Sequence, residues 1–165
     1  MKQLILMRHA KSDWSAGSGS DIARPLNARG RKSAAAVGAW LREGGFTPDA
    51  VLCSAATRTQ ETLERLSLPG KPQITVTRDL YLAEPMVMLA MLQAAEGDSV
   101  LMLGHNPGSA AFAETLLETA PQHPDFHRFP TCATLVARFD ITEWAVLTPG
   151  TGTPQQFIVP RELTD

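Results

Sequence analysis

Short apolar runs alternate along the chain with longer segments that have helical periodicity. Four runs have the length of buried strands: Lys2–Met7, Ala50–Cys53, Ile74–Thr77 and Ser99–Leu103. Each is followed by a predicted helix. The first helix begins after Asn27 and ends at Gly44-Gly45, and the second and third are Thr57–Leu66 and Pro85–Ala95. The fourth is capped by Asn106, opens with Pro107 and ends near Glu118. This alternation predicts a three-layer α/β/α sandwich around a mostly parallel sheet.

The rest of the pattern is less regular. Ser15–Ser20, with two glycines between serines, predicts a flexible surface loop, and Ala120–Thr131, with three prolines, an irregular excursion. Leu135–Phe139 and Trp144–Thr148 are predicted as strands paired through a turn, and Phe157–Val159 as a last short strand. These strands would form an antiparallel edge of the sheet.

Composition limits the class of protein. The 165 residues fit a single domain over 1–165, and 44% hydrophobic with 19% charged residues is typical of a globular chain. A formal net charge of −2 argues against nucleic acid or an anionic membrane as partner. No stretch is long enough to span a membrane, and the apolar run Leu4–Met7 is too short for a signal peptide. We therefore expect a cytoplasmic protein, with Cys53 and Cys132 as reduced thiols.

Basic side chains and histidines follow three of the predicted strands. Arg8-His9 ends the first strand, Arg58 lies in the first turn after the second, and His105 follows the fourth. In open α/β sheets, ligands bind beyond the carboxyl ends of the strands, where helix N-termini also favour anions. The sequence therefore predicts an anion site that contains two arginines and two histidines.

These residue types suit phosphoryl transfer. The planar fork of arginine gives two charge-assisted hydrogen bonds to a phosphate. Nearby cations lower the pKa of an imidazole, so His9 can keep a lone pair and attack phosphorus. His105 can then bind the equatorial oxygens in the transition state. Neither a metal nor another cofactor is required, and the sequence offers no convincing metal site.

The motifs resemble those of a known family. L-M-R-H-A at Leu6–Ala10, S-A-A-T-R-T-Q-E-T at Ser54–Thr62 and G-H-N-P at Gly104–Pro107 resemble the histidine phosphatase superfamily, which has the phosphoglycerate mutase-like fold. R-P-L-N-A-R-G at Arg24–Gly30 is similar to its SixA-like phosphohistidine phosphatases. The resemblance implies His9 as the nucleophile.

The resemblance also implies the rest of the pocket. Arg8, Arg58 and His105 would complete the phosphate site, and Arg24 would reach the phosphate as well. A histidine phosphotransfer protein is a partner implied by the resemblance alone. Asn27 is first a helix N-cap, with a substrate contact as the alternative.

One position departs from the family signature. The superfamily has Arg-His-Gly where this chain has Ala10. Alanine allows a close backbone approach but disfavours a positive φ. We expect the change to leave activity intact.

The leaving group decides the substrate. An alkoxide needs a proton from a positioned acid, whereas the imidazole of phosphohistidine leaves with a weak acid or none. Glu84, before the predicted helix at Pro85, is a candidate acid; the alternative is a carboxylate favoured by the helix dipole. The primary hypothesis is a phosphatase acting on phosphohistidine in proteins. The alternatives are a small-molecule phosphomonoesterase and a catalytically silent phosphate-binding module.

Overall fold

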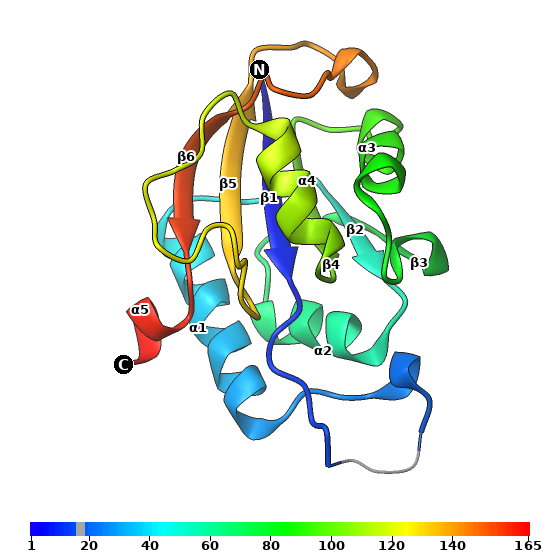
Figure 1. Cartoon of the computed structure of the whole chain (residues 1–165), viewed down its shortest axis with the longest axis vertical. Coiled ribbons are helices and arrows are strands. Elements are labelled where there is room, and N and C mark those ends of the chain that lie inside the picture. Colours follow the sequence, from blue (N-terminus) through cyan, green and yellow to red (C-terminus); the bar gives the residue numbers. More distant parts are fainter. Residues whose placement is uncertain (16–18) are drawn as a thin grey trace.

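A six-stranded mixed sheet forms the centre of the molecule (Figure 1). The computed structural model describes residues 1–15 and 19–165, so the middle of the predicted Ser15–Ser20 loop lies outside the described residues. In the order of the chain, the strands are β1 (Lys2–Arg8), β2 (Ala50–Ser54), β3 (Gln73–Thr77), β4 (Ser99–Gly104), β5 (Thr134–Phe139) and β6 (Thr153–Ile158). In space the order is β3-β2-β4-β1-β5-β6.

The direction of the strands agrees with the predicted fold. β1 pairs with β4, and β2 with β3 and β4, all in parallel. β5 is antiparallel to β1 and to β6, which forms the predicted antiparallel edge. The carboxyl ends of β1, β2 and β4 therefore lie at one end of the sheet.

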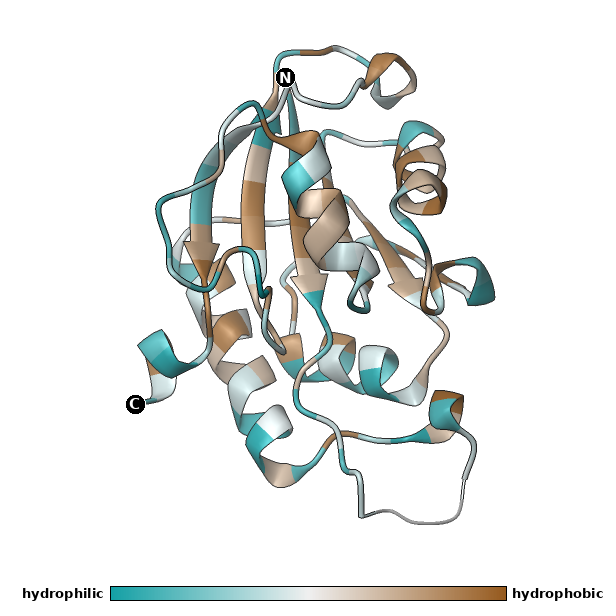
Figure 2. Ribbon diagram, in the orientation of Figure 1, coloured by the Kyte–Doolittle hydropathy of each residue, from teal (hydrophilic) through white to brown (hydrophobic). Residues whose placement is uncertain are grey.

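Helices cover both faces of this sheet (Figure 1). Their bounds are α1 (Ala28–Glu43), α2 (Thr57–Leu66), α3 (Pro85–Gln93), α4 (Gly108–Leu116) and α5 (Arg161–Thr164). Side chains of a strand alternate between its faces. In β1, Ile5 and Met7 join the core under α1 and α2, whereas Leu4 and Leu6 join the core under α3 and α4. Much of the central strand β1 is accordingly apolar, whereas the edge strand β6 is partly hydrophilic (Figure 2). The predicted three-layer α/β/α sandwich is confirmed.

Local signals explain how α1 is placed. The Asn27 side chain caps it by accepting a hydrogen bond from the N–H of Gly30 at 2.8 Å. A Cβ atom at Gly30 would collide with the carbonyl of Lys11, and one at Gly38 with the carbonyl of Leu66. Glycine at these two positions lets α1 pack closely on the segment after β1 and on α2.

Three predicted elements differ in the structure. Trp144–Thr148 is not a strand: Trp144–Val146 is the short 3-10 helix η3, in which buried Trp144 packs on Phe139 and donates from Nε1 to the Gly97 carbonyl at 2.8 Å. The partner of β5 is instead β6, which is longer than the predicted Phe157–Val159. A short apolar run does not distinguish a strand from a packed turn.

The helix after β4 also begins later than predicted. α4 starts at Gly108, and Pro107 is its N-cap residue, but the side chain of Asn106 still satisfies a first-turn N–H of the helix, as predicted. The Asn106 amide donates to the carbonyl of Phe129 at 2.9 Å, and its Oδ1 accepts from the N–H of Ala110 at 3.2 Å.

Over the residues that the structure describes, no helix has the length and apolar character needed to cross a membrane.

Candidate active site

Three chain segments meet at the carboxyl end of the sheet. Arg8 stands opposite Gly104 in the parallel register of β1 and β4, and the His9 N–H donates to the Gly104 carbonyl at 3.0 Å. The rings of His9 and His105 are therefore neighbours, with centroids 5.3 Å apart. Arg58 comes from the first turn of α2, and its Nη2 lies 3.4 Å from Nδ1 of His105. The four residues singled out at the strand ends lie together.

His9 is held as a neutral ring with one defined tautomer. It is 6% exposed, and Nδ1 lies 2.7 Å from the carbonyl oxygen of Ala10, which can only accept. Nδ1 therefore carries the proton and Nε2 keeps the lone pair. Burial, with the nearby charges of Arg8 and Arg58, lowers the pKa of His9 to about 3, against the opposing effect of the Ala10 carbonyl. A free lone pair on Nε2 is what a nucleophilic histidine needs.

Ala10, the departure from the family signature, fits its place. Its N–H donates to Oγ1 of Thr62 at 3.0 Å, its side chain is fully buried, and it is not among the described residues with positive φ. The backbone here is therefore one that alanine adopts without strain.

The two arginines keep hydrogen-bond donors free. Arg8 donates from Nη1 to the Phe129 carbonyl at 3.3 Å, and Arg58 from Nη1 to the Asp21 carbonyl at 2.7 Å. The Nε–H of each is buried and has no hydrogen-bond partner within the described part of the chain. A buried donor without an acceptor is costly, so both groups favour an anion that offers several oxygens.

His105 is oriented by Ser54 and Arg58. Arg58 can only donate, so Nδ1 of His105 accepts, and Nε2 donates to Oγ of Ser54 at 2.7 Å. Burial, followed by the charge of Arg58, lowers the pKa of His105 to about 4. The ring of Tyr81 packs edge-on against it, with centroids 5.4 Å apart. To donate from Nδ1 to a phosphate, His105 would have to take up a proton, or move its proton from Nε2 to Nδ1 while the Ser54 hydroxyl donates to Nε2.

Asp21 also belongs to this group of side chains, although the sequence pattern does not predict it as a site residue. It lies in the 3-10 helix η1 (Asp21–Ala23), where Oδ1 accepts from Arg24 and Oδ2 from Arg58 at 3.0 Å and from the hydroxyl of Tyr81. These three donors, Tyr81 first, hold the pKa of the carboxyl far below its usual range, although desolvation acts the other way. Neither periodicity nor motif marks Asp21; its only signal was that it precedes Arg24 by three residues.

Arg24 lies beside the site but is engaged elsewhere. Besides Asp21, it contacts Ser12, to whose Oγ its Nε donates at 3.0 Å, and its guanidinium lies 3.6 Å above the ring of Trp14. Asn27 lies close by in the chain. Its Oδ1 caps α1, and its amide donates to the Ser12 carbonyl at 3.4 Å. The N-cap role predicted for Asn27 is confirmed, and a substrate contact remains a prediction.

Glu84 stands at the N-terminus of α3. It is the N-cap residue, but its side chain makes no capping hydrogen bond. The neighbouring Ala83 packs against Gly108, where a Cβ would collide with the Ala83 carbonyl, so this turn lies at the start of α4. Within the described residues, no hydrogen bond or ion pair joins Glu84 to His9, Arg58 or the other members of the set.

Two further histidines, His123 and His127, lie four residues apart between β4 and β5. His123 pairs with Glu162 at 2.7 Å and His127 with Glu114 at 2.7 Å, so the two histidines do not share a ligand. Across residues 1–15 and 19–165, no group of three or more His, Cys, Asp or Glu side chains could hold a metal ion. Cys132 is a buried free thiol, and burial raises its pKa to about 12.

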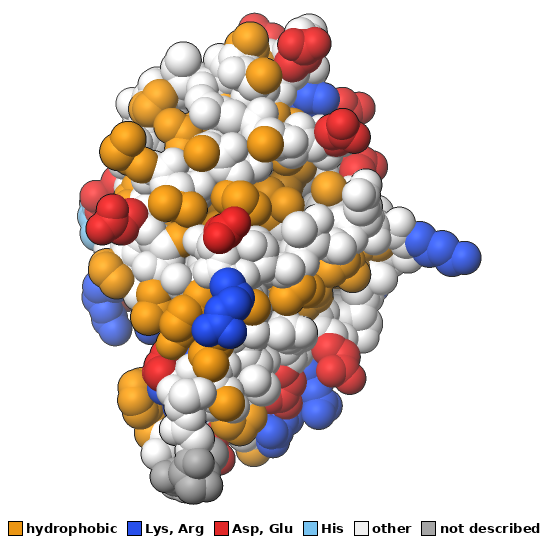
Figure 3. Space-filling view, turned by 90° about the vertical axis from the view of Figure 1, so that its right-hand side faces the viewer, with side chains coloured by type: hydrophobic (Ala, Val, Ile, Leu, Met, Phe, Trp, Pro, Cys, Tyr) orange, Lys and Arg blue, Asp and Glu red, His pale blue; other side chains and the backbone are white. Residues whose placement is uncertain are grey.

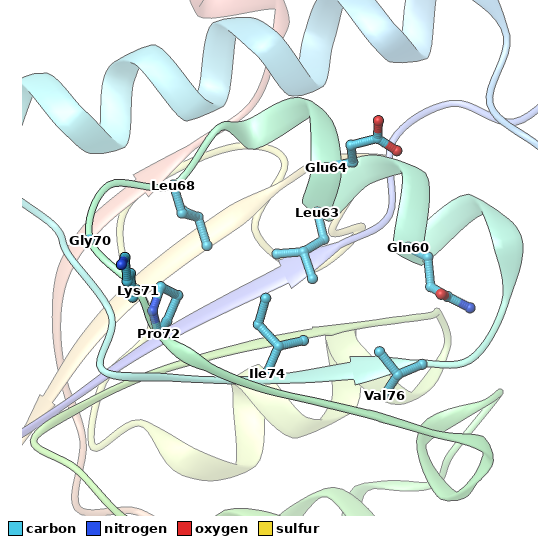
Figure 4. Close-up of a pocket in the computed structure, with 9 residues that line it drawn as sticks. All are labelled: Gln60, Leu63, Glu64, Leu68, Gly70, Lys71, Pro72, Ile74 and Val76. Carbon is cyan, nitrogen blue, oxygen red and sulfur yellow. The ribbon is translucent and has the colours of Figure 1, made fainter.

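A groove lies between α2 and the edge strand β3, away from the histidines (Figure 4). Leu63, Leu68, Ile74 and Val76 line it, with polar side chains at its rim. Seen from the side of β3 and α3, the surface shows many apolar side chains (Figure 3). This groove has no nucleophile or paired charges that would support chemistry.

Comparisons with known proteins agree with the geometry of the site. A sequence model of the histidine phosphatase superfamily (branch 1) matches residues 4–84. An uncharacterized protein of Mycobacterium tuberculosis is 35% identical over 163 residues, covering 94% of this chain and all of the relative.

Solved structures show the same fold. A proposed phosphohistidine phosphatase SixA of Nakamurella multipartitia superposes with a TM-score of 0.84 at 28% identity, covering 96% of each chain. The protein histidine phosphatase SixA, solved in complex with tungstate, superposes with a TM-score of 0.77 at 26% identity, covering 98% of this chain and 99% of the other.

Proposed function

The chain belongs to the histidine phosphatase superfamily and is SixA-like, and from this premise we propose that it is a phosphohistidine phosphatase that acts through a covalent phosphohistidine on Nε2 of His9. The observation that carries the proposal is the state of His9. Its Nδ1–H is donated to the Ala10 carbonyl at 2.7 Å, which leaves the Nε2 lone pair free beside Arg8 and Arg58.

In the first step, Nε2 of His9 attacks the phosphorus of the substrate. The bond between phosphorus and the substrate imidazole breaks, and its electron pair stays on the imidazole, which leaves as a neutral ring once its other nitrogen is protonated by solvent. His9 then carries the phosphoryl group on Nε2 and its own proton on Nδ1. The Ala10 carbonyl stabilises the positive charge that develops on this ring.

Arg8 and Arg58 stabilise the charge on the transferred group. The Nε–H groups of both are buried donors without a partner among the described residues, and the equatorial oxygens of a phosphoryl group would accept from them. A related structure, SixA solved with tungstate, supports an oxyanion site in this fold, because tungstate is an oxyanion of phosphate-like shape and charge.

In the second step, water attacks the phosphorus of phosphorylated His9. The P–N bond breaks, inorganic phosphate forms with the proton of the water, and the neutral Nδ1–H tautomer of His9 is regenerated. Because imidazole is the leaving group in both steps, neither step needs a strong positioned acid.

The same point supports phosphohistidine over alkyl esters as substrate. Asp21 is held as a carboxylate by Tyr81, Arg24 and Arg58, which keep its pKa low, so it is no proton donor. Glu84 makes no hydrogen bond to the histidines within the described residues. With Asp21 held as a carboxylate and Glu84 bonded to no member of the site in the described structure, the site suits an N–P bond better than an alkoxide leaving group.

The test compares a phosphohistidine peptide with p-nitrophenyl phosphate as substrates of the wild type and of His9→Ala. We expect faster turnover of the peptide, loss of both activities in His9→Ala, and label from ³²P-substrate on His9 after an acid-free quench. Faster hydrolysis of the ester would favour a small-molecule phosphomonoesterase. A folded wild type that turns over neither substrate would contradict the phosphatase and favour a phosphate-binding module.

A further inference from the structure

We infer that Asp21 is a specificity-determining residue whose carboxylate competes with phosphate for Arg58 and Arg24, and so weakens the binding of free phosphate. This inference rests on the proposed phosphate site. It concerns how that site treats an oxyanion, whatever group the phosphate is attached to.

The carboxylate of Asp21 has the ligand set that a phosphate would use. One oxygen accepts from Arg24 and the other from Nη2 of Arg58 and from the hydroxyl of Tyr81. Two guanidinium groups and a hydroxyl are typical donors for a bound oxyanion. Asp21 is therefore a substitute anion built into the chain.

Arg58 shows the competition most directly. Its Nη2 is shared between Oδ2 of Asp21 at 3.0 Å and Nδ1 of His105 at 3.4 Å, while its Nε–H is buried without a partner in the described structure. A phosphate that accepts from Nε lies next to the same Nη2, because the two donors belong to one planar fork. Arg58 is 2% exposed, so water cannot readily replace either anion on its guanidinium, and the phosphate and the Asp21 carboxylate compete for the same buried donor.

Arg24 gives the second part of the argument. Its Nη1 is bound by Asp21, its Nε by Ser12, and its guanidinium plane lies on Trp14. A phosphate that Arg24 binds through Nη1 shares this nitrogen with the Asp21 carboxylate, and one bound through Nη2 shares the same guanidinium charge with it. Binding of phosphate thus costs part of two ion pairs that already exist.

The competition has a functional consequence. Inorganic phosphate is the product and offers only its own oxygens, so it has to replace Asp21 without further contacts. A phosphorylated side chain on a protein adds contacts outside the pocket that offset this cost. Asp21 therefore favours release of the product over retention.

A role in positioning Arg58 alone predicts a different outcome. Nη1 of Arg58 is held by the backbone carbonyl of Asp21 at 2.7 Å, and this bond does not depend on the side chain. If the carboxylate only oriented Arg58, its removal would loosen the guanidinium and weaken phosphate binding. If it competes, its removal strengthens phosphate binding.

The experiment is calorimetric titration of inorganic phosphate into the wild type, Asp21→Asn and Asp21→Ala. Asn keeps the shape of the side chain, and the Asp21 side chain is 44% exposed, so both variants are expected to fold. Asp79→Asn is the matched control: it removes the same charge from the turn η2 (Arg78–Leu80) before Tyr81, and in the described structure its side chain has no ion pair with either arginine.

We expect Asp21→Asn and Asp21→Ala to bind phosphate about tenfold more tightly than the wild type, because a charge-assisted hydrogen bond no longer has to be replaced. Asp79→Asn should bind like the wild type. Equal or weaker binding in both Asp21 variants would overturn the role of Asp21 and leave the phosphatase standing.

The proposed function is tested by hydrolysis of the phosphohistidine peptide, whereas the role of Asp21 is tested by phosphate binding. Tighter phosphate binding in the Asp21 variants, together with a wild type that does not hydrolyse the phosphohistidine peptide, would support Asp21 and contradict only the proposed substrate. Binding of phosphate by none of the proteins would overturn the phosphate site, and with it this inference.

Discussion

The hydroxyl oxygen of Ser54, the last residue of β2, lies 2.7 Å from Nε2 of His105, which follows the neighbouring strand β4. Arg58 can only donate to Nδ1 of His105, so the proton on Nε2 is given to Ser54. Ser54 of β2 thus fixes the tautomer and the orientation of His105, which follows β4. Ser54 therefore acts on the site through His105.

Replacing Ser54 by alanine tests this relationship. His105 would keep a buried Nε2–H without an acceptor, so we expect the free energy of unfolding to fall by about 1–3 kcal/mol. We also expect kcat/KM to fall about tenfold, because the ring can turn. Ser109→Ala is the control: Ser109 is also fully buried, but its Oγ has no partner among the described residues. The measurements are urea unfolding and steady-state kinetics of both variants. Equal effects of Ser54→Ala and Ser109→Ala would contradict the role of Ser54.

The lowered pKa of His9 predicts how stability depends on pH. Burial, with the charge of Arg8, lowers this pKa from 6.5 to about 3 in the folded chain. As pH falls below about 6.5, the unfolded chain therefore binds a proton that the folded chain refuses, and stability is lost progressively toward pH 3. His9 alone should remove about 2 kcal/mol between pH 7.5 and pH 5.

The measurement is urea unfolding of the wild type and of His9→Gln at both pH values. Glutamine does not titrate, so the variant should lose about 2 kcal/mol less than the wild type over this interval. Equal losses would show that His9 is protonated in the folded protein, which would also weaken its assignment as a neutral nucleophile.

The main site was predictable because its residues follow strands. Parallel strands bring their carboxyl ends together whatever their distance along the chain, so Arg8-His9, Arg58 and His105 could be placed at one edge from the apolar pattern alone. The same logic gave the layers and the parallel direction of β1 to β4.

Residues on turns were not predictable in this way. Asp21 and Tyr81 reach the site from the 3-10 turns η1 and η2, and no periodicity describes where such turns fold back. Trp144 was assigned to a strand for the same reason: a run of four apolar residues packs equally well as a turn under Phe139.

Ala10 allows a test of the departure from the family signature. It is fully buried, and its backbone conformation does not need glycine. Ala10→Gly should therefore destabilise the chain by about 1 kcal/mol, from the entropy of the unfolded chain and the lost methyl contacts, without raising kcat. Thermal unfolding and turnover of p-nitrophenyl phosphate would check both expectations. An increase in kcat of several-fold would mean that alanine restrains the backbone next to the nucleophile.

Glu84 decides whether the site can cleave esters that need an acid. Its side chain caps no helix and, in the described residues, bonds to neither histidine, so we expect Glu84→Gln to change the turnover of a phosphohistidine peptide by less than about twofold. A slow alkyl phosphate should be affected equally little. Were Glu84 the acid, loss of its proton would slow the alkyl ester by about a hundredfold and spare the phosphohistidine peptide, whose imidazole leaves unaided. The ratio of the two effects, measured on one preparation of each protein, therefore separates an N–P phosphatase from a general phosphomonoesterase without depending on the absolute rate of either reaction.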